Sequence, residues 1–204
     1  MSHKIAIERD NLWPTPLWRT KIEKFRIEER KVSFNEDMLR FIIDEVERDP
    51  KIVKKSNYGG WQSRTDLHKD PATKELCQEI YDICKSMWPF IKGIAFQQMW
   101  AAVNKKGNWN SIHQHGLYEI SGAYYLQVPK NSGRICFRDP RPAAMGNWFV
   151  NKYIDKGELC WYTPEECDLM LWPSYLDHFV EPSESDKDRI MISFDIMLTQ
   201  NLIF

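Results

Sequence analysis

The chain has 204 residues, of which 43% are hydrophobic and 28% charged, proportions typical of a globular protein. Its formal net charge of −1 gives no sign of a nucleic-acid-binding surface. No apolar run approaches the roughly 20 residues that a membrane span requires, and the first residues lack the apolar core of a secretory signal. We therefore expect a cytoplasmic protein that does not cross a membrane.

Two amphipathic helices are predicted in the first half of the chain. The first covers residues 34–48, where Ser33 and Glu36 have the spacing of a capping box and Pro50 ends the pattern. The second follows Asp70, a predicted N-cap with proline at the next position, and ends before Pro89. The apolar stripes of these helices comprise Leu39, Ile42, Ile43 and Val46 in the first and Leu76, Ile80, Ile83 and Met87 in the second.

The pattern changes after Pro89 to short segments rich in β-branched and aromatic residues, separated by turn residues. The predicted strands are 94–103, 109–116, 120–128, 133–138, 168–173, 176–181 and 189–198. Seven strands without intervening helices predict a mainly β fold: a sandwich, a jelly roll or a barrel. We expect one domain over residues 1–204, in which residues 1–92 form a helical support and residues 93–204 the β core.

One long segment, residues 139–167, interrupts this series of strands. A loop of that length in a compact domain is usually functional or disordered. Its aromatic residues would either close over the mouth of the fold as a lid or pack on the outside of a sheet. They are Trp148, Tyr153, Trp161 and Tyr162.

The five cysteines, Cys77, Cys84, Cys136, Cys160 and Cys167, form no C-x-x-C pair. A zinc ribbon and a disulfide framework are therefore not indicated, which favours a reducing compartment.

Histidines provide the main functional signal. His113 and His115 lie one residue apart on a predicted strand, so both should point to the same face and reach one metal ion. His178 lies on another predicted strand, and Arg189 opens the last one. Imidazole suits iron, copper, nickel and zinc. An H-x-H pair alone is often just polar, and the third histidine followed by an arginine strengthens the metal interpretation.

Several motifs resemble the 2-oxoglutarate- and Fe(II)-dependent oxygenases, in a branch with an H-x-H version of the iron motif. They are LWPTPLW, GGWQSRTDL, VNKKGNWNSIHQHGLYEISGAYYLQVP, SGRICFRDPR, and LWPSYLDHFVEP followed by DRIMISFDI. The resemblance implies a double-stranded β-helix (a jelly-roll, cupin-like fold), with Fe(II) as metal, 2-oxoglutarate as cosubstrate and ascorbate as an optional addition. It also implies that His113, His178 and Arg189 are catalytic, and that Arg189 binds the far carboxylate of 2-oxoglutarate.

Two neighbouring tyrosines, Tyr124 and Tyr125, are further candidates for binding 2-oxoglutarate. Adjacent strand residues face opposite ways, so one of them should face the interior, where it would either donate its hydroxyl to 2-oxoglutarate or be an aromatic residue of the core.

The chain departs from the family pattern at His115, where the family has a carboxylate. His115 is either the third metal ligand, giving a three-histidine site with metal ligands His113, His115 and His178, or a residue that contacts the substrate or a ligand. Three neutral imidazoles and the 2-oxoglutarate dianion would leave a neutral ferrous centre, whereas the usual carboxylate makes it singly negative. A second departure is Cys167, where a glycine is expected before DLMLWPS.

The resemblance implies hydroxylation of a second substrate, with release of succinate and CO2. The alternatives are a cupin-like three-histidine dioxygenase that does not use 2-oxoglutarate and a non-catalytic jelly-roll binding module. The sequence leaves the substrate open, whether a small molecule or a peptidyl group, and also the oligomeric state.

Overall fold

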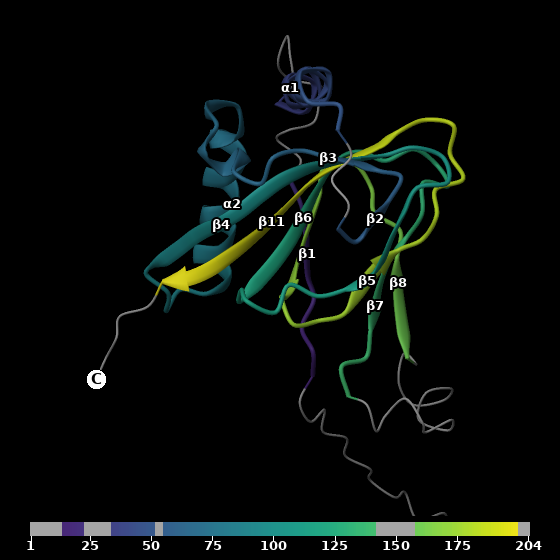
Figure 1. Cartoon of the computed structure of the whole chain (residues 1–204). Coiled ribbons are helices and arrows are strands. Elements are labelled where there is room, and N and C mark those ends of the chain that lie inside the picture. Colours follow the sequence, from purple (N-terminus) through teal and green to yellow (C-terminus); the bar gives the residue numbers. More distant parts are fainter. Residues whose placement is uncertain (1–13, 23–33, 52–54, 142–157, 200–204) are drawn as a thin grey trace, which may run out of the picture.

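A computed structural model of the chain describes residues 14–22, 34–51, 55–141 and 158–199, and its strands form two antiparallel sheets that face each other (Figure 1). The six-stranded sheet has the order β1 (Trp18–Lys21), β9 (Asp168–Pro173), β6 (Ile120–Gln127), β11 (Arg189–Thr199), β4 (Gly93–Asn104) and β3 (Trp61–Gln62). The five-stranded sheet has the order β2 (Asn57–Tyr58), β5 (Trp109–His113), β10 (His178–Val180), β7 (Ile135–Arg138) and β8 (Leu159–Tyr162). This arrangement confirms the predicted mainly β, jelly-roll fold.

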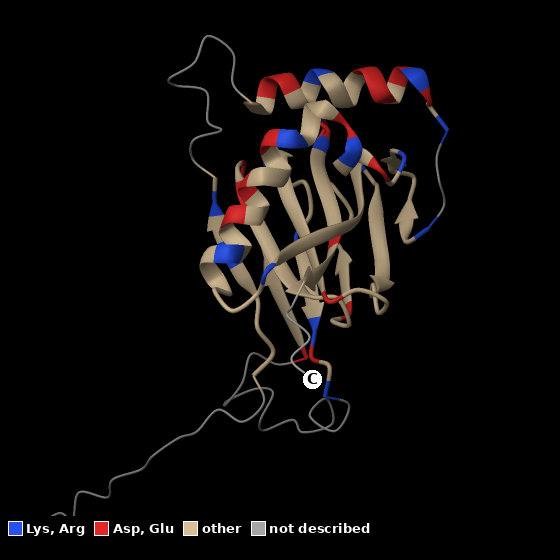
Figure 2. Ribbon diagram, turned by 90° about the vertical axis from the view of Figure 1, so that its left-hand side faces the viewer, with Lys and Arg blue, Asp and Glu red and all other residues tan. Residues whose placement is uncertain are grey.

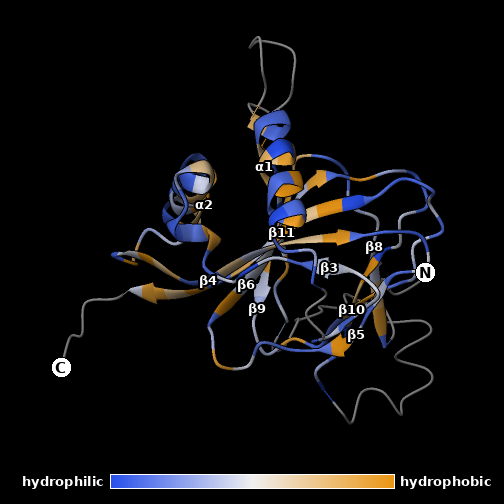
Figure 3. Ribbon diagram, turned by 45° about the horizontal axis from the view of Figure 1, so that its top comes forward, coloured by the Kyte–Doolittle hydropathy of each residue, from blue (hydrophilic) through white to orange (hydrophobic). Residues whose placement is uncertain are grey.

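Two helices cover the outer face of the six-stranded sheet (Figures 1 and 3). They are α1 (Phe34–Arg48) and α2 (Lys74–Met87), and two short 3-10 turns, η3 (Leu67–Lys69) and η4 (Pro71–Thr73), precede α2. Asp70 accepts a hydrogen bond from the Ala72 amide at 3.0 Å, so the predicted cap is confirmed, although the first turn is 3-10. The predicted cap residue Ser33 lies outside the described residues.

The buried face of α1 differs slightly from the predicted stripe. Ile43 is 51% exposed, whereas Met38 and Ile42 are buried. Ile43 therefore does not belong to the core face, because it lies about 100° around the helix from Ile42. The remaining predicted residues Leu39 and Val46 are partly buried against the core.

The central strand β11 has side chains buried on both faces. Its even-numbered residues, such as Ile192 and Phe194, pack with the helices in the larger core cluster. Its odd-numbered residues point toward the five-stranded sheet, where Met191 joins a second cluster and Ser193 lines a pocket. Side chains alternate between the faces of a strand, so this one strand serves both the core and the pocket.

The observed strands differ from the predicted ones in two places that bear on function. The strand predicted over 109–116 ends at His113, so His115 lies beyond it. The segment 139–167 is not a loop throughout, because Trp161 and Tyr162 belong to β8, which pairs with β7. Four-residue strands such as β1 and β8 are too short to show a clear period in the sequence. The other two aromatic residues of the proposed lid, Trp148 and Tyr153, lie outside the described residues.

The turn before β9 contains Cys167 with a φ of 68°, in the left-handed region that favours glycine. Its amide donates to the Tyr125 carbonyl and its carbonyl accepts from the Ile22 amide, both at 2.9 Å. The backbone therefore has the conformation that the expected glycine would adopt. All five cysteines are free thiols, as predicted.

Charged side chains gather on the helices and the connecting segments, while the sheets carry few (Figure 2). Neither of the described α-helices is long and apolar enough to span a membrane.

Gly122 on β6 tests the packing between the sheet and the helical layer. A Cβ added there would lie 2.8 Å from Cδ2 of Leu171 and closer still to the ring of Phe194. We predict that Gly122→Ala lowers the free energy of unfolding by about 1–3 kcal/mol, the usual cost of overpacking, as measured by urea denaturation. The control is Gly116→Ala, whose Cβ would meet only the end of the Gln114 side chain at 3.3 Å. Equal stability of the two variants would contradict this account of the core.

Candidate functional site

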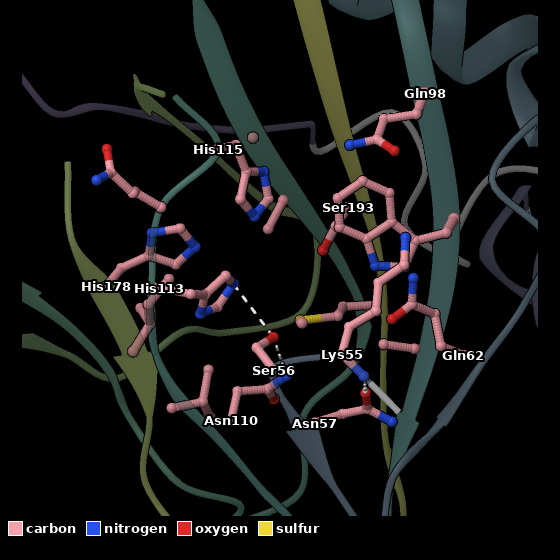
Figure 4. A pocket seen from close by; sticks show the side chains of 18 of the residues that line it. Lys55, Ser56, Asn57, Gln62, Gln98, Asn110, His113, His115, His178 and Ser193 are labelled. Carbon is pink, nitrogen blue, oxygen red and sulfur yellow. Dashed lines mark hydrogen bonds between the residues drawn. The ribbon is translucent and has the colours of Figure 1, made fainter. Parts of the chain in front are cut away.

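Three histidines converge between the two sheets, although they come from separate segments (Figure 4). His113 at the end of β5 pairs directly with His178 at the start of β10, and their ring centroids are 4.3 Å apart. His115 lies in the turn after β5, where its amide donates to the Ser174 carbonyl at 2.8 Å. Its ring centroid is 5.2 Å from each of the other two. One nitrogen atom from each ring lies within 4.8 Å of those of the other two.

Hydrogen bonds fix which nitrogen of each ring is available. Nδ1 of His113 lies 2.7 Å from the Ser111 carbonyl, and Nδ1 of His178 lies 3.0 Å from the Leu176 carbonyl. A carbonyl only accepts, so these Nδ1 atoms carry the proton and each Nε2 keeps a lone pair. In His113 that lone pair faces the Ser56 hydroxyl at 3.3 Å.

Burial also keeps these rings neutral. Removal from water lowers the pKa of His113, and it lowers the pKa of His178 further, with the nearby His113 ring adding to the effect. His178 is only 4% exposed. Neutral imidazole is the form that coordinates a metal, and a cluster of three suits a first-row ion such as Fe(II). The chemistry of the donor set therefore fits the metal that the sequence implies.

The histidines line a pocket of about 570 Å³. No Asp or Glu is among the described residues around it, and Lys55 is the one charged side chain among those residues. Carboxamides are frequent in its wall: Asn57, Gln62, Gln98, Asn104, Asn110 and Gln114. Trp61, Trp100 and Trp172 supply apolar surface. The lining therefore favours neutral or anionic ligands.

Arg189 is 1% exposed and lies next to this pocket but is not part of its surface. Its Nη1 donates to the carbonyls of Ser132 and Gly133, each at 3.2 Å. Its Nε has no partner among the described residues. A buried guanidinium without a carboxylate is costly, and an anionic carboxylate is the ligand that its planar fork fits best. Tyr125, which interacts electrostatically with Arg189, and Met191 line that pocket.

The side chains of the two tyrosines lie on opposite faces of β6, as expected for neighbouring residues of a strand. Tyr125 lines the pocket, and burial raises its pKa to about 12, so the hydroxyl remains protonated and able to donate. Tyr124 lies on the opposite face of β6, where its hydroxyl donates to Oδ1 of Asn35 on α1 at 2.7 Å. The prediction that Tyr124 binds the cosubstrate is therefore corrected, because its side chain belongs to the helical side of the sheet.

A family model described as "Putative 2OG-Fe(II) oxygenase" matches residues 98–195, which include the three histidines and Arg189. Over these residues the chain is similar to the 2-oxoglutarate- and Fe(II)-dependent oxygenases. It is accordingly a 2-oxoglutarate-dependent non-haem iron dioxygenase, and its cofactors are Fe(II) and 2-oxoglutarate. No curated protein sequence matches the chain.

Solved structures of oxygenases share the fold at low sequence identity. The viral collagen prolyl hydroxylase of Paramecium Bursaria Chlorella virus-1, in complex with 2-oxoglutarate, is 13% identical with a TM-score of 0.58, covering 87% of this chain and 94% of its own. A Pseudomonas putida prolyl-4-hydroxylase is 12% identical with a TM-score of 0.55, covering 92% and 94%. HygX from Streptomyces hygroscopicus, with nickel, 2-oxoglutarate and hygromycin B bound, is 12% identical with a TM-score of 0.61, covering 92% and 84%.

Sequence reasoning missed a polar group behind His115. Nδ1 of His115 lies 2.7 Å from Oδ1 of Asp195, which is fully buried on β11. The signal was present as a lone acidic residue in an otherwise apolar strand, RIMISFDIML, at a position that alternation assigns to the same face as Arg189.

We predict that His178→Ala and His113→Ala each weaken Fe(II) binding, because each removes one imidazole from the cluster. The loss should exceed the roughly 10–100-fold that follows removal of a ligand's hydrogen-bond partner. Anaerobic titration measures the affinity. His68→Ala is the control, since His68 stacks on Phe96 and does not line the pocket. Binding by His178→Ala as tight as in the unmodified protein would contradict the site.

Proposed function

We propose that this oxygenase couples the oxidative decarboxylation of 2-oxoglutarate to hydroxylation of a second substrate. In the balanced reaction, 2-oxoglutarate, O2 and a substrate C–H group give succinate, CO2 and the corresponding alcohol. One oxygen atom enters the new hydroxyl group and the other enters the succinate carboxylate. The observation that carries this proposal is the cluster of three imidazoles, His178 buried and the other two partly buried, beside a pocket that adjoins a buried arginine.

We propose His113, His115 and His178 as the protein ligands of Fe(II). Support comes from the convergence of their rings and from hydrogen bonds that occupy Nδ1 in each, which leaves the three Nε2 atoms for the metal. The alternative role for His115, a contact to substrate, would leave only two protein ligands among the described residues that converge here.

The anion-binding role falls to Arg189 and Tyr125. Arg189 would pair with the far carboxylate of 2-oxoglutarate, and the protonated Tyr125 hydroxyl would donate a second hydrogen bond. Both residues are almost fully buried, so the cosubstrate would bind where water competes little for these contacts.

When bound, Fe(II) with 2-oxoglutarate activates dioxygen for oxidation of the second substrate. The chain supplies orientation and a shielded pocket. Two tryptophans place apolar rings beside the histidines. The ring centroid of Trp100 lies 5.6 Å from that of His115, and the ring centroid of Trp172 lies 5.0 Å from that of His178. Ascorbate would serve only to keep iron ferrous in an assay.

The lining of the pocket and the structural neighbours bear on the substrate class. Two of these neighbours are prolyl hydroxylases and one has hygromycin B bound, so peptidyl and small-molecule substrates both suit the fold. The absence of Asp and Glu among the described lining residues favours a substrate without a cationic group close to the histidines.

The function is tested by succinate formation under air with Fe(II), 2-oxoglutarate and ascorbate, first without substrate and then with candidate peptides and small molecules. We predict that Arg189→Ala weakens 2-oxoglutarate binding by about 2–5 kcal/mol, because truncating one side of a buried charge pair leaves the other unpaired. Arg189→Lys should lose less, since it keeps the charge but not the planar fork.

The control for Arg189 is Arg134→Ala, which removes a neighbouring but exposed arginine paired with Glu181. Oxygen consumption without succinate would favour the three-histidine dioxygenase that does not use 2-oxoglutarate. Unchanged 2-oxoglutarate affinity in Arg189→Ala would refute the proposed role of that residue.

For His115, we predict that His115→Ala binds Fe(II) more weakly than His115→Asp, because only the latter keeps a side chain able to coordinate metal. Anaerobic titration compares the two with the unmodified protein. Equal affinity of His115→Ala and the unmodified protein would show that His115 is not a ligand.

A further inference from the structure

Asp195 is a fully buried carboxylate directly behind one of the three histidines. Its Oδ1 accepts hydrogen bonds from Nδ1 of His115 at 2.7 Å and from the Ser121 hydroxyl at 2.5 Å. Its Oδ2 accepts from the side-chain amide of Gln98. Among the described residues, no Lys or Arg forms an ion pair with it.

Three adjacent strands build this carboxylate site. In the register of the six-stranded sheet, Asp195 on β11 stands opposite Gln98 on β4 and opposite Ser121 on β6. Both neighbours donate to it, and the pairing of β11 with β4 shifts register immediately after Asp195. The Ser174 hydroxyl lies 2.9 Å from that of Ser121 and can donate to it in turn. Bulges are frequent next to active sites, so a row of paired polar residues beside one indicates a functional role in addition to packing.

The Asp195 carboxylate has no Lys or Arg beside it, among the described residues, to balance its negative charge. Burying an ionised carboxylate without a cation is costly, even when neutral donors satisfy its oxygens. The group through which a cation would reach it is His115, whose other nitrogen faces the centre of the histidine cluster. A carboxylate that holds the far nitrogen of a metal-bound imidazole fixes the ring and makes it a better ligand.

We propose that Asp195 is the positioning residue of the metal centre: through His115 it supplies, one imidazole further out, the negative charge that a directly coordinating carboxylate supplies in the usual iron motif. This inference rests on the proposed function. With Asp195 counted, the centre with Fe(II) and 2-oxoglutarate carries a single negative charge, the same total as the usual two-histidine, one-carboxylate site.

The proposal makes the effect of Asp195→Asn depend on the residue at position 115. In the unmodified protein, Asp195→Asn removes the charge but keeps a side chain of the same size, and metal affinity should fall about 10–100-fold. In a His115→Asp background Asp195 has no imidazole to act through, so Asp195→Asn should lower metal affinity clearly less. A purely structural role for Asp195 would lower affinity by the same factor in both backgrounds.

The measurement is anaerobic titration of the four proteins, with Fe(II) and with Co(II), whose visible absorption band reports the coordination directly. Thermal unfolding of the metal-free proteins shows whether each variant folds. If Asp195→Asn does not fold, Asp195→Ser replaces it, because the smaller side chain fits the site and also removes the charge, and the same difference between the two backgrounds is expected.

Two controls separate charge from general disruption. Ser121→Ala removes one donor to Asp195 but leaves the carboxylate, so it should cost clearly less affinity than Asp195→Asn. Glu45→Gln neutralises another buried carboxylate, which lies on α1, pairs with Arg48 and Arg64 and does not line the pocket, and it should leave affinity unchanged.

The inference is overturned if Asp195→Asn leaves metal affinity unchanged in the unmodified background, or lowers it by as much in the His115→Asp background. Both results presuppose that the unmodified protein binds metal. Absence of metal binding by that protein would instead refute the proposed function, and with it the inference.

Discussion

The alternation of side chains along β11 is the constraint on which the rest of the structure depends. One face of this strand is apolar and carries the two helices, while the other face carries Arg189, Met191, Ser193 and Asp195 toward the five-stranded sheet. A slip of one residue in its register would exchange the faces, burying two charged groups under the helices. The long pairing of β11 with β4 and β6 holds it against such a slip.

Each sheet contributes a different part of the site. The five-stranded sheet presents His113 and His178 as a direct cross-strand pair, and the six-stranded sheet presents Asp195 and Arg189. His115 joins the two, because it lies in the connection between β5 and β6 and bonds to Ser174 through its amide and to Asp195 through its ring. The distance between the sheets therefore sets the geometry of the histidine cluster.

Several polar and charged side chains in and next to the pocket lack a partner of opposite charge within the described part of the protein, and a bound ligand would supply that partner. Burial disfavours charge on His113 and His178, which suits them to a cation, while Arg189 keeps an Nε without a partner among the described residues. Buried groups without partners lower the stability of the free protein. A metal ion and a dianion that pair with them would raise that stability on binding. Asp195 belongs to the same balance, since its carboxylate has only neutral donors and an imidazole around it.

The sequence by itself determined the mainly β fold, the two helices, seven of the strands within a few residues, and His113, His178 and Arg189 as candidates. Those features follow from local periods, turn residues and the spacing of motifs. Only the tertiary structure decided that Tyr125 and not Tyr124 faces the pocket, since strand period gives two faces without saying which is inner. It also brought His115 to the cluster from a turn instead of a strand, and set Asp195 behind it. These contacts join residues far apart in sequence, and pairing between strands, which no local pattern encodes, brings them together.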